Sequence, residues 1–135
     1  MSRRPRSTTE GLVYHLISRF VDRDWFITCA EERAMYLRLF GDAVAKSDWL
    51  CLAYAVMSNH IHLALLAGEQ PVSWLRDAHS PFANWMNERH DRIGPMFVRG
   101  PKDKPVQPGG VGRLIAYIHN NPVRAGVVTS PAESD

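Results

Sequence analysis

Two apolar runs of strand length, separated by a Ser-Asn turn at 58–59, are the feature that most limits how this chain can fold. The runs cover residues 49–57 and 60–66. So short a connection favours an antiparallel hairpin. His60 and His62 open the second run, and alternate residues of a strand project to the same face. We therefore expect both imidazoles on one face of a sheet.

Two imidazoles on one face suit a divalent metal ion. Neutral imidazole is a common ligand of first-row metals, and two such ligands leave other coordination positions for water or a phosphate oxygen. The alternative is an ordinary pair of strand histidines whose ring nitrogens bond backbone carbonyls. The pair His60 and His62 does not by itself decide between the two.

Length and composition indicate one globular domain. The chain has 135 residues, of which 45% are hydrophobic and 22% charged, as is ordinary for a protein with its own core. Residues 1–10 are polar and arginine-rich, and we interpret them as a flexible basic arm preceding a single domain at 11–130. A net charge of +2 and a pI near 8.7 permit an anionic partner without requiring one.

Cysteine usage and hydropathy predict the compartment. Cys29 and Cys51 are too few and too far apart for a zinc knuckle or a disulfide framework, which favours a reducing, intracellular setting. The chain opens with no signal-peptide pattern, and no apolar run approaches the length of a membrane span. We expect a cytoplasmic protein with no membrane partner.

Hydrophobic periodicity gives the order of elements. It predicts strands at 12–18, 49–57, 60–66 and 93–98, a short extended piece at 25–28, and helices at 31–46, 72–89 and 111–120. Pro81 is expected to kink or restart the second helix. A Pro/Gly-rich loop at 100–112 leads into the third helix, which Asn121-Pro122 is expected to end. The order predicts an α+β domain, a ferredoxin-like or RRM-like antiparallel sheet with helices mainly on one face.

Tyr117 differs from the other three tyrosines. Tyr14 and Tyr54 lie in predicted strands and Tyr36 belongs to the apolar stripe of the first helix, so packing accounts for them. Tyr117 follows the Pro/Gly-rich loop and precedes Asn121 by four residues, one helical turn. The phenol and the amide should therefore point the same way.

Three blocks of the sequence, taken together, resemble one family. They are YAVMSNHIHL at 54–63, FANWMNERH at 82–90 with GPMF at 94–97, and YIHNNPVRAG at 117–126. This ordered set resembles the REP-associated tyrosine transposases, HUH single-tyrosine enzymes related to small insertion-sequence transposases. The resemblance extends from about Tyr14 to Val128, nearly the whole chain.

The resemblance implies a nuclease that cuts and rejoins single-stranded DNA near a hairpin. By position, His60 and His62 match the ligands of a divalent cation, Mg²⁺ or Mn²⁺, and Asn121 matches the polar residue that helps to complete the metal site. Tyr117 matches the nucleophile, which would form a 5'-phosphotyrosine linkage. Some relatives exchange the tyrosine helix between subunits, so the resemblance leaves a monomer and a homodimer open.

Basic residues near these blocks are candidate DNA contacts. Arg99, Lys102, Arg113 and Arg124 could follow a phosphate backbone, and ordinary surface charge is the alternative.

Two other functions compete with that of a nuclease. A histidine-triad nucleotide hydrolase needs a third histidine two residues after the second, where this chain has Ala64. A domesticated, catalytically inactive protein that binds hairpin DNA or RNA would keep the sheet and the arginines without cutting. The sequence leaves the second rival open.

Overall fold

A computed structural model describes residues 8–21, 27–98 and 102–124. Its elements are β1 (Val13–Arg19), α1 (Ala30–Lys46), β2 (Leu50–Val56), β3 (His60–Leu66), a 3-10 turn (Val72–Leu75), α2 (Arg76–Arg89), β4 (Lys102–Val106), a second 3-10 turn (Pro108–Gly110) and α3 (Val111–Arg124). The four strands form one sheet in the order β2-β3-β1-β4, with every neighbouring pair antiparallel. This is the ferredoxin-like arrangement, and the predicted fold class is confirmed.

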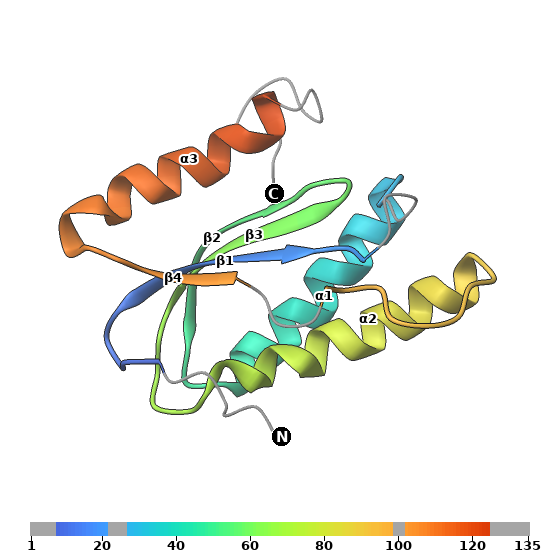
Figure 1. Ribbon diagram of the computed structural model, residues 1–135, viewed down its shortest axis with the longest axis horizontal. Coiled ribbons are helices and arrows are strands. Elements are labelled where there is room, and N and C mark those ends of the chain that lie inside the picture. The colour runs from blue at the N-terminus through green and yellow to red at the C-terminus, as the bar shows by residue number, and fades with distance from the viewer. Residues whose placement is uncertain (1–7, 22–26, 99–101, 125–135) are drawn as a thin grey trace.

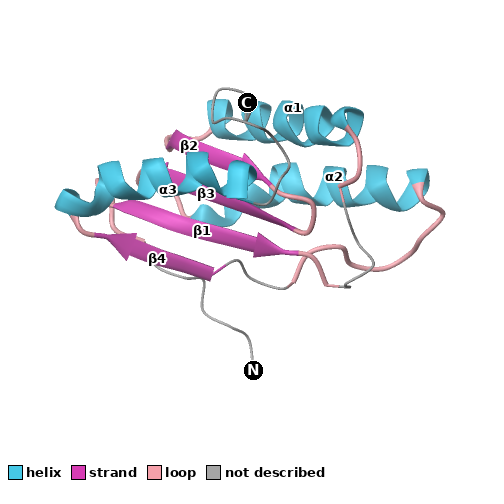
Figure 2. Ribbon diagram, turned by 90° about the horizontal axis from the view of Figure 1, so that it is seen from above, coloured by secondary structure: helices cyan, strands magenta, loops and turns pink. Residues whose placement is uncertain are grey.

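Helices cover both faces of the sheet unequally. Figure 1 shows α1 and α2 on one side and α3 alone on the other. In the view from above, β4 lies at the edge of the sheet, away from α1 (Figure 2). The helix α3 packs against β2 and β3. Two of the three helices therefore share a face, as the sequence predicted.

The larger core lies between the sheet and the α1–α2 layer. It is built from aromatic and branched side chains that are fully or almost fully buried, among them Leu16, Tyr36, Phe40, Trp49, Leu63 and Phe82. Burying one such side chain contributes roughly 1.5–3 kcal/mol. This core fixes β1 and β3, the strands that carry the histidines, in one register.

A smaller core lies under α3. Its sheet side is made mostly of alanines, Ala53, Ala55 and Ala64, and its helix side is centred on Ile118, which is fully buried. Short side chains on the sheet let a helix approach closely. The position of Ile118 therefore sets which neighbouring residues of α3 face the uncovered strands.

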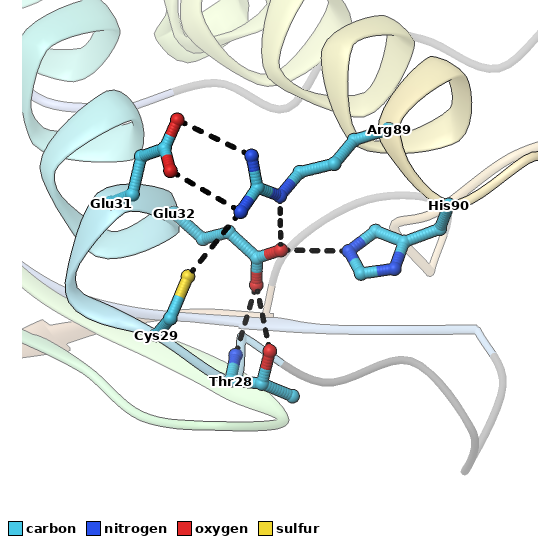
Figure 3. A network of polar contacts seen from close by, with 6 residues as sticks. All are labelled: Thr28, Cys29, Glu31, Glu32, Arg89 and His90. Atoms are coloured by element: carbon cyan, nitrogen blue, oxygen red, sulfur yellow. Dashed lines mark hydrogen bonds and ion pairs between the residues drawn. The ribbon is translucent and has the colours of Figure 1, made fainter.

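A buried carboxylate joins α1 to α2 (Figure 3). Glu32 is 1% exposed, and its Oε2 accepts from Arg89 Nε at 2.8 Å and from His90 Nε2 at 2.7 Å. Its Oε1 accepts from the backbone N–H of Thr28 at 2.9 Å. Arg89 also forms an ion pair with Glu31, which lies beside Glu32 in the first turn of α1. The start of α1 is thereby tied to the end of α2.

Most predicted elements are confirmed with bounds shifted by one or two residues. The hairpin of β2 and β3 turns at Ser58 and Asn59, as expected. The first strand begins at Val13 rather than residue 12, and α1 begins at Ala30. Of the extended piece predicted at 25–28, residues 25–26 lie outside the described residues and 27–28 form no strand.

The prediction of the last strand was wrong. Residues 93–98 contribute only an isolated bridge between Phe20 and Phe97. The fourth strand is β4, inside the segment 100–112 that was predicted to be a loop. Pro105 made this segment look irregular, yet proline is tolerated in a strand that pairs on one side only. Among the described strands, β4 lies at the edge of the sheet and pairs with β1.

Two prolines lie inside helices that continue past them, so the expected end at Asn121-Pro122 was wrong and the second helix does not restart at Pro81. The helix α2 runs through Pro81, and the only change along this segment is from a 3-10 turn to an α-helix at Arg76. The helix α3 continues past Asn121-Pro122 to Arg124. A proline loses its own N–H bond and crowds the carbonyl four residues earlier, but the helix on either side can persist when tertiary packing holds it.

The N-terminal segment and the two cysteines were also interpreted from the sequence. Most of the predicted arm, residues 1–7, lies outside the described residues, while Thr9 donates its N–H to the Tyr14 hydroxyl at 2.9 Å. Cys29 and Cys51 are both free thiols. Among the described helices, none has the length and apolar character needed to cross a bilayer.

Candidate functional site

Three imidazoles meet on the face of the sheet that carries α3. His60 and His62 alternate along β3, so both project to this face. His15 lies on the neighbouring β1, opposite Ala64 and diagonal to His62. The His15 and His62 rings stack with centroids 5.2 Å apart, and the His60 ring stands edge-on to His62 at 4.7 Å. His15 is far from the other two histidines in sequence and lies beside them because of the register between β1 and β3.

Hydrogen bonds link the rings into a chain. His15 Nε2 lies 3.0 Å from His62 Nδ1, and His62 Nε2 lies 3.0 Å from His60 Nε2. The remaining nitrogen of His60, Nδ1, lies 2.7 Å from Asn59 Oδ1. His62, at the centre of the chain, is 4% exposed. Both of its ring nitrogens are therefore engaged by other imidazoles.

The environment keeps these imidazoles neutral. The pKa of His62 is lowered to about 4, mainly by burial and then by the nearby His60, His15 and Arg19, which act in the same direction. Burial and then Arg19 lower the pKa of His60, and burial and then Lys104 lower that of His15. Neutral imidazole is the form that binds metals, because a protonated ring has no free lone pair. All three rings are thus in the ligating form at neutral pH.

Tyr117 stands beside this cluster. Its neighbour Ile118 is buried against the sheet, which directs Tyr117 to the border of the covered region, where it is 41% exposed. The phenol ring lies edge-on to His62 with centroids 6.0 Å apart, and edge-on to His15 at 6.2 Å. Since α3 packs on the sheet of its own chain, the phenol and the imidazoles of one chain can reach the same small ligand.

Two of the candidate metal ligands have a spacing that fits a cation. Ligands at adjacent corners of an octahedron, with bonds of about 2.1 Å, lie about 3.0 Å apart. His60 Nε2 and His62 Nε2 are 3.0 Å apart. Within the described ranges, no group of three or more His, Cys, Asp or Glu side chains is arranged to hold an ion. A third protein ligand would therefore come from another residue type or from outside these ranges.

The other predicted site residues are only partly placed. Asn121 and Arg124 belong to α3 and Lys102 to β4, but their side chains lie outside the described part of the structure, as does the whole of Arg99. Arg113 is exposed on the first turn of α3. Their roles as a metal ligand or DNA contacts stay predictions.

Three residues near the cluster were missed by the sequence analysis. His15 and Arg19 alternate along β1, and Arg19 pairs opposite His60. Lys104 pairs opposite His15 from β4. Alternation along residues 13–19 could have placed the first two on one face, but only strand pairing shows that it is the face of His60. Lys104 was hidden because its strand was predicted to be a loop.

Comparison with known proteins places the fold. Neither protein-family models nor curated proteins give a match to this sequence. Among solved structures, one is a REP-associated tyrosine transposase bound to a REP hairpin, with a TM-score of 0.76 and 15% identity over 98% of this chain and 79% of that one. The chain shares the fold of this transposase. A second structure, a predicted transposase from Deinococcus radiodurans R1, matches with a TM-score of 0.58 and 20% identity over 88% of this chain and 97% of that one.

Proposed function

We propose that this chain is a transposase of the REP-associated tyrosine type, a metal-dependent nuclease that cuts and rejoins single-stranded DNA near hairpins. The observation that carries the proposal is the position of the Tyr117 ring 6.0 Å from that of His62, beside the paired Nε2 atoms of His60 and His62. The shared fold with a transposase bound to a REP hairpin supports hairpin DNA as the substrate class.

The proposed chemistry is transfer of a phosphate ester to tyrosine. The Tyr117 oxygen attacks phosphorus, the bond from phosphorus to the 3'-oxygen breaks, and the 5' side of the break becomes linked to tyrosine. The phenolic proton lost is matched by the proton that the 3'-oxygen gains. Because one ester replaces another, the reverse attack by a 3'-hydroxyl rejoins DNA without ATP.

A cation would be held by His60 and His62, with Asn121 as a further ligand. When bound, Mg²⁺ or Mn²⁺ neutralises charge on the scissile phosphate and orients it for in-line attack. A phenol, whose pKa is ordinarily about 10, is a weak nucleophile at neutral pH and needs such help. The neutral state of both imidazoles, which follows from the lowered pKa of each, keeps their lone pairs available.

Cations on the same face would hold the strand. Arg19, opposite His60, and Lys104, opposite His15, flank the imidazoles from β1 and β4. Four residues of strand separate His15 from Arg19, or about 13 Å, which is long enough for more than one phosphate of an extended strand. Arg113 and the cations predicted at 99, 102 and 124 would extend this contact.

A second candidate is a hairpin-binding protein that no longer cuts. One observation favours it: the shared fold with a transposase bound to a REP hairpin accounts for hairpin binding without any covalent step. Such a protein would bind the same DNA through the same cations. The two candidates differ only in whether a covalent adduct forms.

The test is an adduct assay. Labelled single-stranded hairpin DNA is incubated with the protein and Mg²⁺ or Mn²⁺, and the products are separated under denaturing conditions. We expect a covalent protein–DNA adduct that is absent with a chelator, with Tyr117→Phe and with His60→Ala. Tyr54→Phe, which removes a hydroxyl from the opposite face of the sheet, is the matched control and should form the adduct. Binding without any adduct would favour the second candidate, and cleavage that survives Tyr117→Phe would reject the nucleophile.

A further inference from the structure

Each imidazole of the candidate metal pair has its second ring nitrogen engaged by a neighbour. His60 Nδ1 lies 2.7 Å from Asn59 Oδ1, and His62 Nδ1 lies 3.0 Å from His15 Nε2. The two Nε2 atoms that remain lie 3.0 Å apart. Metal-binding histidines typically donate the N–H of the non-ligating nitrogen to such a partner, which fixes the tautomer and the ring orientation.

The chemistry of Asn59 decides the tautomer of His60. A carboxamide oxygen only accepts hydrogen bonds, so His60 Nδ1 must carry the hydrogen and donate it. A neutral imidazole carries one ring hydrogen, and His60 Nε2 is therefore left with its lone pair. Asn59 thus presents His60 Nε2 to its neighbour as a base and a ligand.

The tautomer of His62 depends on what lies between the two Nε2 atoms. Without a cation, His62 donates Nε2–H to His60 Nε2 and accepts from His15 Nε2–H at Nδ1, because two lone pairs on nitrogens only 3.0 Å apart would repel. With a cation bound to both Nε2 atoms, His62 must carry its hydrogen on Nδ1 and donate it to His15 Nε2. His15 then carries its own hydrogen on Nδ1. Both rings exchange tautomers and stay neutral.

We propose that Asn59 and His15 are positioning residues of the metal site: each holds one ligand imidazole through its Nδ1 so that both Nε2 lone pairs can bind one divalent cation. This inference rests on the proposed function, since it assumes that His60 and His62 bind the ion. It goes further by assigning two residues that act on the metal through another side chain.

Both positioning residues stand on anchored backbone. The turn that carries Asn59 is fixed by bonds from Ile27 N to Ser58 O at 2.7 Å and from Phe20 N to Asn59 O at 3.3 Å. His15 lies in β1, which pairs with β3 on one side and with β4 on the other. Groups held on paired strands and an anchored turn keep their orientation without the ligand, as an ordered site requires.

Metal affinity without DNA is the first measurement. Mn²⁺ is titrated into the full chain at neutral pH, and free Mn²⁺ is followed by electron paramagnetic resonance. Losing an orienting partner of this kind typically weakens metal binding about 10–100-fold. We expect that loss for Asn59→Ala and for His15→Phe, and little change for the matched controls Asn84→Ala and His119→Ala at exposed helical positions. Thermal unfolding monitors whether each variant is folded.

Conservative variants and a spectroscopic readout separate positioning from mere stability. Asn59→Asp keeps an acceptor for His60 Nδ1–H and should restore binding, and His15→Gln should restore part of it. Nitrogen-15 spectra of the imidazoles should show the His62 hydrogen on Nε2 without Mg²⁺ and on Nδ1 with it, while the His60 hydrogen stays on Nδ1. Failure of Asn59→Asp to bind better than Asn59→Ala, or a His62 tautomer that Mg²⁺ does not move, would overturn the proposal.

The outcomes also separate this inference from the function on which it rests. If wild-type protein binds Mn²⁺, His60→Ala does not, and both Asn59→Ala and His15→Phe bind as tightly as wild type, only the positioning roles are wrong. If His60→Ala binds Mn²⁺ as tightly as wild type, the metal pair itself is wrong, and the positioning roles are overturned with it.

Discussion

Two polar clusters lie on opposite sides of one sheet, and they use their polar groups differently. On the α1–α2 side, the Glu32 carboxylate accepts from Thr28, Arg89 and His90, so the buried charge is matched by donors and by a cation (Figure 3). On the α3 side, the imidazoles contact one another and Asn59, and the charges that act on them are positive, from Arg19 and Lys104. The first cluster is complete without a ligand. The second offers lone pairs to a cation and positive charge to a phosphate.

The two clusters also differ in the balance behind their pKa shifts. Burial alone would raise the pKa of Glu32, but hydrogen bonds from Thr28, His90 and Arg89 outweigh it, and the pKa is lowered. For His62 the largest cause is burial itself, and nearby imidazoles and Arg19 act in the same direction. The charged form of Glu32 is stabilised by its partners, so this group stabilises the fold. His62 is kept neutral beside cations, so its imidazole can bind a metal ion.

The largest effect should come from His62→Phe. It removes one of the two proposed ligands while keeping a flat ring in the same space, so adduct formation should fall at least about 100-fold, because the scissile phosphate is no longer polarised. The rate of adduct formation on hairpin DNA measures this. The matched variant on the other side, Glu32→Gln, should form the adduct at a rate close to wild type wherever it is folded. Equal losses in both variants would erase the distinction between the clusters.

Stability should respond in the reverse order. Glu32→Gln replaces a carboxylate that accepts hydrogen bonds from the backbone N–H and hydroxyl of Thr28, from Arg89 and from His90. The free energy of unfolding should therefore fall by about 1–3 kcal/mol. Urea unfolding followed by circular dichroism gives this value. His62→Phe should change it less. A Glu32→Gln protein as stable as wild type would mean that the carboxylate does not tie α1 to α2.

The two clusters should affect stability in two different pH ranges. The folded pKa of His62, about 4, lies below its usual value near 6.5, so the unfolded chain takes up the proton first and stability falls as pH drops from about 6.5 towards 4. His79, buried against Tyr36, acts in the same direction. The lowered pKa of Glu32 adds a loss that appears only below about pH 4.5.

Variants assign these pH ranges. Unfolding curves at about pH 7, 6.5, 5.5, 4 and 3 should show that His62→Phe has a smaller drop than wild type between pH 6.5 and 4. Glu32→Gln should keep that drop and lose only the decline below about pH 4.5. A His62→Phe protein with the full wild-type drop would show that His62 is not held neutral by its surroundings.

The smallest effect should come from the flanking cations. Arg19→Ala and Lys104→Ala should each weaken binding of an unstructured single strand by roughly fivefold to tenfold and lower the magnitude of the salt slope by about 0.7. Fluorescence anisotropy over a range of salt concentrations measures both values. Arg38→Ala, which removes an exposed cation from α1 on the other side of the sheet, should leave them unchanged. An equal loss for Arg38→Ala would mean that the net charge of the protein determines binding, and not the cations on the imidazole face of the sheet.

The sequence predicted most of the fold because its strongest signals are local. Apolar periodicity in 31–46 and the two runs around Ser58 specify a helix and a hairpin without help from the rest of the chain. β4 escaped prediction because it is short, contains Pro105 and pairs on one side only. Its existence depends on β1, a contact that no local pattern contains.

Strand alternation and the family resemblance were enough to predict part of the candidate site. His60 and His62 share a face because they are two residues apart, and Tyr117 stands beside them as the resemblance implied. His15 and Lys104 reach the site only through the pairing of β1 with β3 and β4, so register had to be known first.

The central claim is that the Tyr117 phenol and the imidazole pair act on one phosphate. The direct measurement is mass spectrometry of the protein–DNA adduct after digestion with trypsin and nuclease. Cleavage after Arg113 and Arg124 releases residues 114–124, in which Tyr117 is the one hydroxyl-bearing side chain. We expect a nucleotide linked through phosphate to this peptide in wild-type protein and none in His62→Phe. A nucleotide linked to a peptide containing Tyr14, Tyr36 or Tyr54, or DNA cleavage with no modified peptide, would contradict a shared role of Tyr117 and the imidazole pair.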